Sequence, residues 1–270
     1  MSEQSAPPVI PKEGLHVLHL FYTVEYGQWQ LFTQSEQIEA KTNLASLVQE
    51  IRATEQTQLL MFSMVSPKAD LGFMLVTPDL QVANAFEKRL TLALGADVLS
   101  PAYSYFSMTE QSDCLSSHDE YPESIRADPD SPELATELEQ ANAQMINDRD
   151  EKLYPILPNW PVFCFSPLGK HRGDGQNSSL PAADQRKALL AAYARLGRRW
   201  QDRVFQVITG SSGLDSMEWG ITLLSQDTTH IKNLMDEMRF DPVAANFAEF
   251  GDFYLGLQLP LDEIYRRLQL

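Results

Sequence analysis

Short apolar runs that are typical of β-strands alternate along this chain with longer stretches of helical periodicity. In the N-terminal part, apolar side chains recur at helical spacing in 31–53 and in 79–94, and Asp79 can cap the second helix. The segments around these helices are rich in β-branched and aromatic residues and are bounded by turn residues. They predict strands at 15–24, 58–65, 71–78 and 102–110, so the order is β-α-β-β-α-β.

The same order of elements recurs in the C-terminal part. The clearest helix of the chain is predicted at 181–200, where Pro181 occupies the first turn and one face is apolar. A further helix is predicted at 228–239, after Asp227. Strands are predicted at 162–168, 203–210, 218–225 and 251–259.

The repeated order predicts an α+β fold made of two ferredoxin-like halves. The segments GFMLVTPDLQVANAFEKRL and WGITLLSQDTTHIKNLMDEM occupy equivalent places, which indicates an internal duplication in which two sheets share an interface. We therefore expect four parts in the chain. They are a disordered tail (1–13), an N-terminal half (14–110), an acidic linker (111–152) and a C-terminal half (153–270).

The net charge of the chain limits the classes of partner that it can bind. The net charge is −16, which argues against nucleic-acid binding because phosphate neutralisation needs a basic surface. Residues 111–152 hold 12 acidic and 3 basic residues, more than half of this charge, and few large apolar side chains, so this segment is expected to be a surface linker with room for a helix at 132–147.

Three features of the sequence indicate where in the cell the protein is expected. The longest apolar runs, such as LLMF at 59–62, are far shorter than the roughly 20 residues of a membrane-spanning helix. The start of the chain lacks the basic and apolar regions of a signal peptide, so we expect a cytoplasmic protein. Cys114 and Cys164 are too few for a disulfide framework or a cysteine-rich metal site.

Several motifs of the chain carry a resemblance to a known family. The motif ITGSSGLDSMEWGITL, followed by EMRFDPVAANFAEFGDFYLG, carries most of it, and HVLHLFYTV and PAYSYFSMTE extend it over nearly the whole chain. In these segments the chain resembles the chlorite dismutase superfamily. The nearest branch is the coproheme decarboxylases, the peroxide-dependent haem synthases. The resemblance implies a dimeric α+β barrel formed by the two halves of one chain. It also implies haem or iron coproporphyrin in the C-terminal half, and a homo-oligomer, in this branch usually a pentamer.

Several positions that carry catalysis in this family hold different residues here. Tyr193 stands where the family has its proximal histidine ligand, although Gly197 and Arg198 of that motif are retained. Ser166 stands at the position of the tyrosine that the decarboxylases oxidise to a radical, and a serine hydroxyl cannot form a stabilised radical as a phenol can. Lys152 replaces an arginine that holds a propionate.

Most other positions of the expected pocket hold residues of the type that the family has there. Lys170 is retained, and Gln206 occupies the distal position, which is glutamine in one decarboxylase branch and arginine in the true chlorite dismutases. Leu168 is expected to supply an apolar wall. At a further position near a propionate, Ala244 replaces a serine.

Each of these residues also has an ordinary structural interpretation. Tyr193 could ligate iron as tyrosinate, as in catalases, but this needs a cationic neighbour because a free phenol has a pKa of about 10, and a core role is the alternative. Gln206 could equally hydrogen-bond the backbone, and Lys170 could belong to a solvated loop. Ser166 has no visible histidine–acid pairing that would make it a nucleophile. Of the five histidines, only His171 is expected near the pocket.

Three functions therefore remain open at this stage. The chain could be a haem-type protein with altered iron ligation, still active as a peroxide-dependent oxidoreductase. It could be a non-catalytic porphyrin carrier or sensor. Or it could be a cofactor-free paralogue that serves as a structural or partner-binding oligomer.

Overall fold

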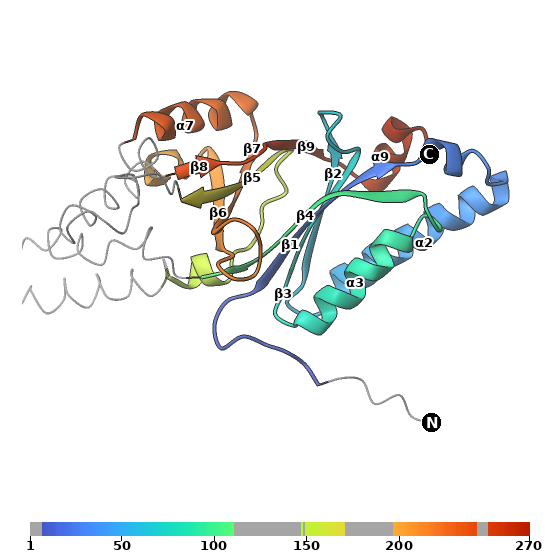
Figure 1. Cartoon of the computed structure of the whole chain (residues 1–270), viewed down its shortest axis with the longest axis horizontal. Coiled ribbons are helices and arrows are strands. Elements are labelled where there is room, and N and C mark those ends of the chain that lie inside the picture. The colour runs from blue at the N-terminus through green and yellow to red at the C-terminus, as the bar shows by residue number, and fades with distance from the viewer. Residues whose placement is uncertain (1–6, 111–146, 148, 171–196, 242–247) are drawn as a thin grey trace, which may run out of the picture.

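Eight strands of the computed structural model close into a barrel in which all neighbouring strands are antiparallel (Figure 1). The structure describes residues 7–110, 147, 149–170, 197–241 and 248–270. The barrel strands are β1 (His16–Val24), β2 (Gln58–Met64), β3 (Leu71–Thr77), β4 (Leu99–Thr109), β5 (Val162–Lys170), β6 (Val204–Gly210), β7 (Trp219–Ser225) and β9 (Tyr254–Gln258).

The strand order is β7-β6-β4-β1-β3-β2-β9-β5, and pairing of β5 with β7 closes the ring. A short strand, β8 (Ala248–Phe250), adds to β5. Each wall of the barrel therefore has an inner and an outer face, because side chains alternate along every strand.

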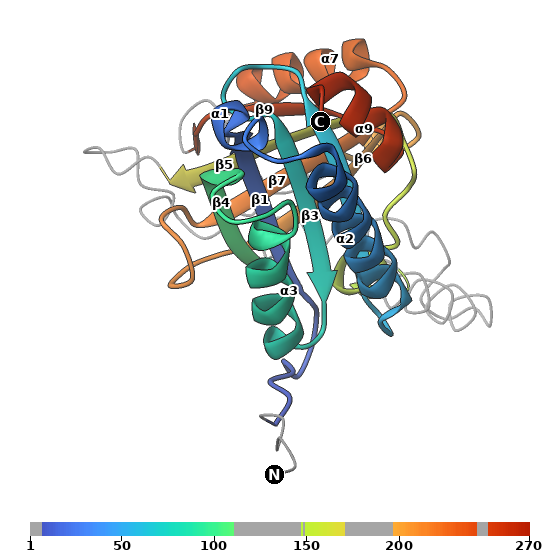
Figure 2. The ribbon, with the colours of Figure 1, turned by 90° about the vertical axis from the view of Figure 1, so that its right-hand side faces the viewer.

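Helices cover the outside of the barrel. The N-terminal strands carry α1 (Tyr26–Trp29), α2 (Gln34–Ala53), α3 (Leu80–Leu92) and α9 (Leu261–Leu268), whereas the C-terminal strands carry α7 (Thr228–Phe240). Figure 2 shows α2 and α3 side by side over β1 and β3. Apolar residues of α2, α3 and α9 form one buried cluster with the outer face of these strands, and α7 forms a second cluster with β5, β6 and β7.

Three helices begin at caps that the local sequence supplies. Thr33 and Glu36 form a capping box at the start of α2, each accepting a hydrogen bond from the other's backbone N–H. The carboxylate of Asp79 accepts from the backbone N–H of Gln81 at α3, and that of Asp227 accepts from Thr229 at α7. The capping predicted for Asp79 is thus confirmed, and so is the start of a helix directly after Asp227.

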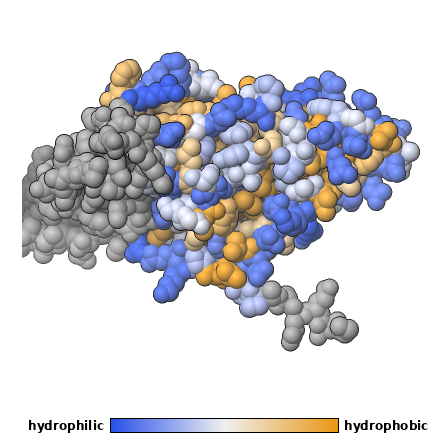
Figure 3. Space-filling view, in the orientation of Figure 1, coloured by the Kyte–Doolittle hydropathy of each residue, from blue (hydrophilic) through white to orange (hydrophobic). Residues whose placement is uncertain are grey.

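The exposed surface over these helices mixes hydrophilic and apolar side chains (Figure 3). None of the helices in the described part of the chain combines the length and the apolarity that crossing a bilayer would take.

Most element boundaries agree with the sequence patterns to within a few residues, but the last segment differs. The strand predicted at 251–259 is divided into β8 and β9 by a break at Gly251–Phe253, and α9 follows where no helix was predicted. Only the last turn, 197–200, of the helix predicted at 181–200 lies within the described residues, and it is helical. Of the expected linker, 111–146 and 148 lie outside them. In the expected N-terminal tail, the backbone N–H of Val9 donates to the carboxylate of Asp79, and the carbonyl oxygen of Val9 accepts from the backbone N–H of Leu80.

Aromatic rings fill the inside of the barrel. Phe62 of β2 and Phe163 of β5 stack with ring centroids 3.7 Å apart, so residues about a hundred positions apart in the sequence are in contact inside the barrel. His19 lies among these rings, fully buried, and stacks on Phe165 at 4.0 Å. Its Nε2 is 2.8 Å from the hydroxyl of Thr222, and its Nδ1 has no partner among the described residues.

The buried position of His19 predicts a pH dependence of stability. Burial lowers the pKa of His19 from 6.5 to about 3, so between these values the unfolded chain binds more protons at this position than the folded protein. The free energy of unfolding should therefore fall as the pH drops below 6.5, by about 1.4 kcal/mol per pH unit from this group.

A His19→Gln variant, which keeps an amide for Thr222, removes this titration. Between pH 7 and pH 5, the variant should lose about 2 kcal/mol less of its free energy of unfolding than the parent protein does. Urea denaturation at both pH values measures the difference. Equal losses in the two proteins would contradict the prediction.

Candidate functional site

The outer face of β5, β7 and β6 brings together three of the residues that the sequence singled out. Ser166 and Leu168 alternate on β5, and in the sheet they lie opposite Ile221 and Trp219 of β7. Gln206 of β6 lies opposite Leu223 on the other edge of β7. Residues directly opposite each other in antiparallel strands share a face, so Ser166, Leu168 and Gln206 lie on one face, spread across three strands.

This face is mainly apolar. Ile221 and Leu223 are buried beneath α7, and Leu168, Ile208, Phe250 and Phe253 are partly buried around them. Cys164 lies in the same row as Gln206, and burial raises the pKa of its thiol to about 12. The thiol therefore stays protonated at neutral pH, unsuited to a nucleophilic or metal-binding role.

Gln206 joins the sheet to the helix that precedes it. Its Nε2 donates a hydrogen bond to the carbonyl oxygen of Gly197, at 3.3 Å. A Cβ at Gly197 would lie 3.8 Å from the same amide, which is ordinary van der Waals contact, so the strand and the helix end meet here without a gap. The half-buried amide of Gln206 thus has a backbone partner.

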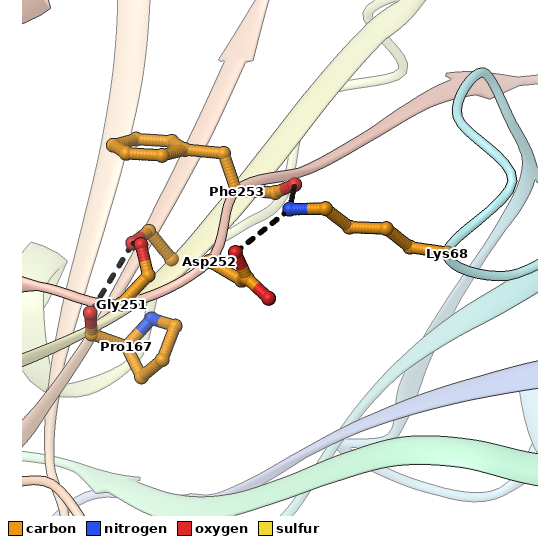
Figure 4. A network of polar contacts seen from close by, with 6 residues as sticks. Lys68, Pro167, Gly251, Asp252 and Phe253 are labelled. Atoms are coloured by element: carbon orange, nitrogen blue, oxygen red, sulfur yellow. Dashed lines mark hydrogen bonds and ion pairs between the residues drawn. The ribbon is translucent and has the colours of Figure 1, made fainter.

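Ser166 has a structural hydrogen bond in place of a free hydroxyl. The side chain is buried, and its Oγ lies 3.2 Å from the carbonyl oxygens of both Gly251 and Pro167, to which it can donate. The backbone N–H of Gly251 in turn donates to Pro167 at 2.8 Å (Figure 4). A Cβ at Gly251 would lie 2.7 Å from Pro167 Cγ, so the close approach of this backbone to the proline ring favours glycine.

The segment after Gly251 is held from the N-terminal half. Lys68, in the turn between β2 and β3, donates to the carboxylate of Asp252 at 2.9 Å and to the carbonyl oxygen of Phe253 at 3.3 Å (Figure 4). Its ammonium group also lies 5.6 Å from the ring centroid of Tyr254. No sequence pattern signals these contacts, because the partners are far apart along the chain.

The remaining predicted site residues lie elsewhere or outside the described part. Lys170 is the last residue of β5, and its backbone pairs with Ala248 of β8. Lys152 is exposed and precedes the buried Leu153, whose carbonyl oxygen accepts from the hydroxyl of Thr109 on β4. Tyr193, His171 and Ala244 lie outside the described residues.

A concave region, which sequence reasoning missed, lies between Trp200 and α7. It has a volume of about 450 Å³ and is lined mainly by charged side chains. The indole N–H of Trp200 donates to Glu237 at 3.1 Å, and the guanidinium of Arg203 lies 5.6 Å from the indole ring. Among the described residues, no group of three or more His, Cys, Asp or Glu side chains could hold a metal ion.

Comparison with known proteins places this barrel in a family. The family model described as chlorite dismutase matches residues 37–259. The chain belongs to the chlorite dismutase family. A solved structure described as a novel heme-binding protein from Thermus thermophilus is 32% identical, with 98% of each chain covered and a TM-score of 0.79.

More distant members share the fold. A chlorite dismutase variant from Candidatus Nitrospira defluvii is 13% identical, with 96% of this chain and 98% of that chain covered and a TM-score of 0.72. The chlorite dismutase of the same organism in complex with imidazole is 14% identical and has a TM-score of 0.71, with 96% and 97% of the two chains covered. The family resemblance predicted from the motifs is therefore confirmed, and so is the barrel.

The hydrogen bonds of Ser166 predict a measurable contribution to stability. Ser166→Ala leaves the carbonyl oxygen of Gly251 without this donor and should lower the free energy of unfolding by about 1 kcal/mol. Ser104→Ala, on the exposed side of β4, is the matched control and should change it by less than about 0.5 kcal/mol. Urea denaturation compares the two, and equal effects would exclude a structural role for the Ser166 hydroxyl.

Proposed function

We propose that the protein is a haem-type tetrapyrrole protein of the chlorite dismutase family with a degenerate active site that no longer supports coproheme decarboxylation. The observation that carries the proposal is the apolar outer face of β5, β7 and β6. Ser166 is buried on this face, and the family resemblance assigns it to the position of the oxidisable tyrosine. Haem binding by the Thermus thermophilus relative supports a tetrapyrrole ligand for this chain.

The residues of this face are better suited to contact a porphyrin ring than to ligate its iron. A porphyrin needs a broad apolar wall, which Leu168, Ile208 and Ile221 can supply, and cations for its propionates, for which Lys170 and Lys152 are the candidates. The described histidines are not on this face. His16 and His19 lie on β1, and His230 lies in α7. Tyr193 is then the candidate axial ligand, and the sequence supplies no second one on the same helix.

The protein's own groups limit the chemistry. Bound iron porphyrin would supply the activation of peroxide. Ser166 offers no phenol to be oxidised, and its hydroxyl proton is directed at backbone carbonyl oxygens. Gln206 can donate or accept a hydrogen bond at the distal position but cannot take up a proton at neutral pH. Neither side chain therefore supplies a group that transfers electrons to or from a ligand.

Finer features of the proposal come from the family resemblance. We place the chain nearest to the coproheme decarboxylase branch, as a cytoplasmic homopentamer whose barrel is built from two ferredoxin-like halves. Tyr193, Lys170, Lys152 and Leu168 would contact the tetrapyrrole, with Gln206 on the distal side. The acidic segment 111–152 would join the two halves.

One observation favours a second function, that of a cofactor-free structural or partner-binding paralogue. Gln206 reaches the carbonyl oxygen of Gly197 directly, so the sheet and the helix end are already in contact where a macrocycle would need space. In that case, the retained family motifs would maintain the barrel and its self-association only. Spectroscopic titration with a porphyrin distinguishes the two functions.

The first test concerns the reaction. Iron coproporphyrin III mixed with the protein and titrated with hydrogen peroxide should keep both reactive propionates, because no phenol stands at position 166. Mass spectrometry of the extracted porphyrin measures this. Stepwise loss of two carboxyl groups would contradict the proposal. A Tyr154→Phe variant would then show whether that half-exposed phenol has taken over.

The second test concerns binding. Haemin should bind weakly to the parent protein, since there is no iron–histidine bond and Ala194 adds a methyl group where the family has glycine. A methyl group inserted in a packed site costs about 1–3 kcal/mol, so Tyr193→His combined with Ala194→Gly should tighten binding by at least about tenfold. It should also produce the absorption spectrum of a histidine-ligated haem.

Tyr26→His is the matched control for this test, because Tyr26 lies in α1 of the N-terminal half. It should leave the haemin affinity and spectrum of the parent unchanged. Failure of both the parent and the double variant to bind haemin would favour the cofactor-free paralogue.

A further inference from the structure

Two tyrosines from opposite walls of the barrel stack on each other. Tyr103 comes from β4 and Tyr254 from β9, strands that are separated by three others on each side of the ring. Their rings are nearly parallel, at 5°, with centroids 5.0 Å apart. Parallel rings at this distance are offset and stacked, which brings carbon atoms of the two phenols into van der Waals contact.

The stack continues into the barrel. Phe21 lies against Tyr254 with centroids 4.4 Å apart and against Tyr103 at 6.2 Å. Neither phenol oxygen has a hydrogen-bond partner among the described residues, in contrast to Tyr22 and Tyr105, whose hydroxyls bond to Thr91 and to the carbonyl oxygen of Met217. Tyr103 is half-buried, so its ring can be reached from solvent.

Charged groups surround this pair. Burial raises the pKa of Tyr103, and the carboxylates of Asp215 and Asp252 add to the effect. The pKa of Tyr254 is also raised, by burial and by Asp252. Both phenols are therefore neutral at neutral pH, and an electron can leave only together with the phenol proton. Solvent, which reaches the half-buried Tyr103, is available to take up that proton.

We infer that Tyr103 and Tyr254 form an oxidative modification site, at which a diffusible one-electron oxidant joins the two rings as dityrosine. Each phenol loses one electron to an equivalent of oxidant and one proton to solvent. The two phenoxyl radicals form a carbon–carbon bond between ring positions adjacent to the oxygens. The hydrogens at those positions move to the oxygens, so that both phenols are restored. Two equivalents of oxidant are reduced in all.

The bond would connect opposite walls of the barrel. β4 belongs to the N-terminal half, and β9 closes the ring next to β5, so one covalent link would hold the two halves together independently of the hydrogen bonds between strands. Constraining the unfolded chain in this way stabilises the folded state, as a disulfide across a long loop does. The site requires no tetrapyrrole, so this inference stands apart from the proposed function.

The test is oxidation of the full-length protein with two equivalents of hexachloroiridate(IV) at low protein concentration. Dityrosine fluorescence should appear in the intact chain, and digestion followed by mass spectrometry should give a cross-linked peptide pair that contains Tyr103 and Tyr254. Tyr103→Phe and Tyr254→Phe, which keep the stacked ring, should each abolish this pair and most of the fluorescence. The cross-linked protein should unfold at a higher temperature than the untreated protein.

Exposed tyrosines provide the matched controls. Tyr26 and Tyr154 are 40% and 47% exposed, and their replacement by Phe should leave the yield of the Tyr103–Tyr254 link unchanged. Oxidation in guanidinium chloride, where the chain is unfolded, should show no preference for this pair. The inference is overturned if the folded protein yields no dityrosine. It is also overturned if the links join other tyrosines, or if the fluorescence persists in the Tyr103→Phe variant.

Discussion

Closure of the sheet by β5 is the constraint on which the rest of this structure depends. β5 pairs with β9 along one edge and with β7 along the other, and these pairings turn a row of strands into a ring without free edges. Once the ring is closed, alternate residues of each strand are committed to the inside or to the outside. Phe163 and Phe165 must then fill the interior, while Ser166 and Leu168 face or border the outer layer.

Local patterns explain why most of the fold could be predicted from the sequence. Strands such as 71–77 are short, apolar throughout and bounded by turn residues, and α3 and α7 each begin at an aspartate whose carboxylate binds the first turn. The break at Gly251 between β8 and β9 could not be predicted from such local patterns. Its cause is the approach of Pro167, more than eighty positions earlier in the chain, and no local signal reports such a contact. The short helix α9 depends similarly on packing of Ile264 and Leu268 against α2 and β2.

The candidate site likewise has features that the local sequence determines and features that depend on tertiary contacts. Alternation on β5 is a local property, so the sequence could place Ser166 and Leu168 on one face, and the family motif added Gln206. What these side chains bond to is a tertiary property. The partner of Gln206 is a carbonyl oxygen at the end of the preceding helix, and that of Ser166 is a carbonyl oxygen in the break between β8 and β9. Both residues therefore support the packing of the barrel in addition to any contact with a ligand.

The outer and the inner face of the barrel differ in the phenol side chains that they offer for oxidation. On the outer face, Ser166 is buried and hydrogen-bonded to the backbone, and we propose that it stands where the family holds its redox-active phenol. On the inner face, Tyr103, Tyr105 and Tyr254 belong to one aromatic cluster with Phe21 and Phe165. A phenol can be oxidised at either place, but only a phenol beside the ligand can act on it. Under the proposed function, the outer face offers no phenol beside the ligand, so a one-electron oxidant would act on the tyrosines inside the barrel rather than on a bound molecule.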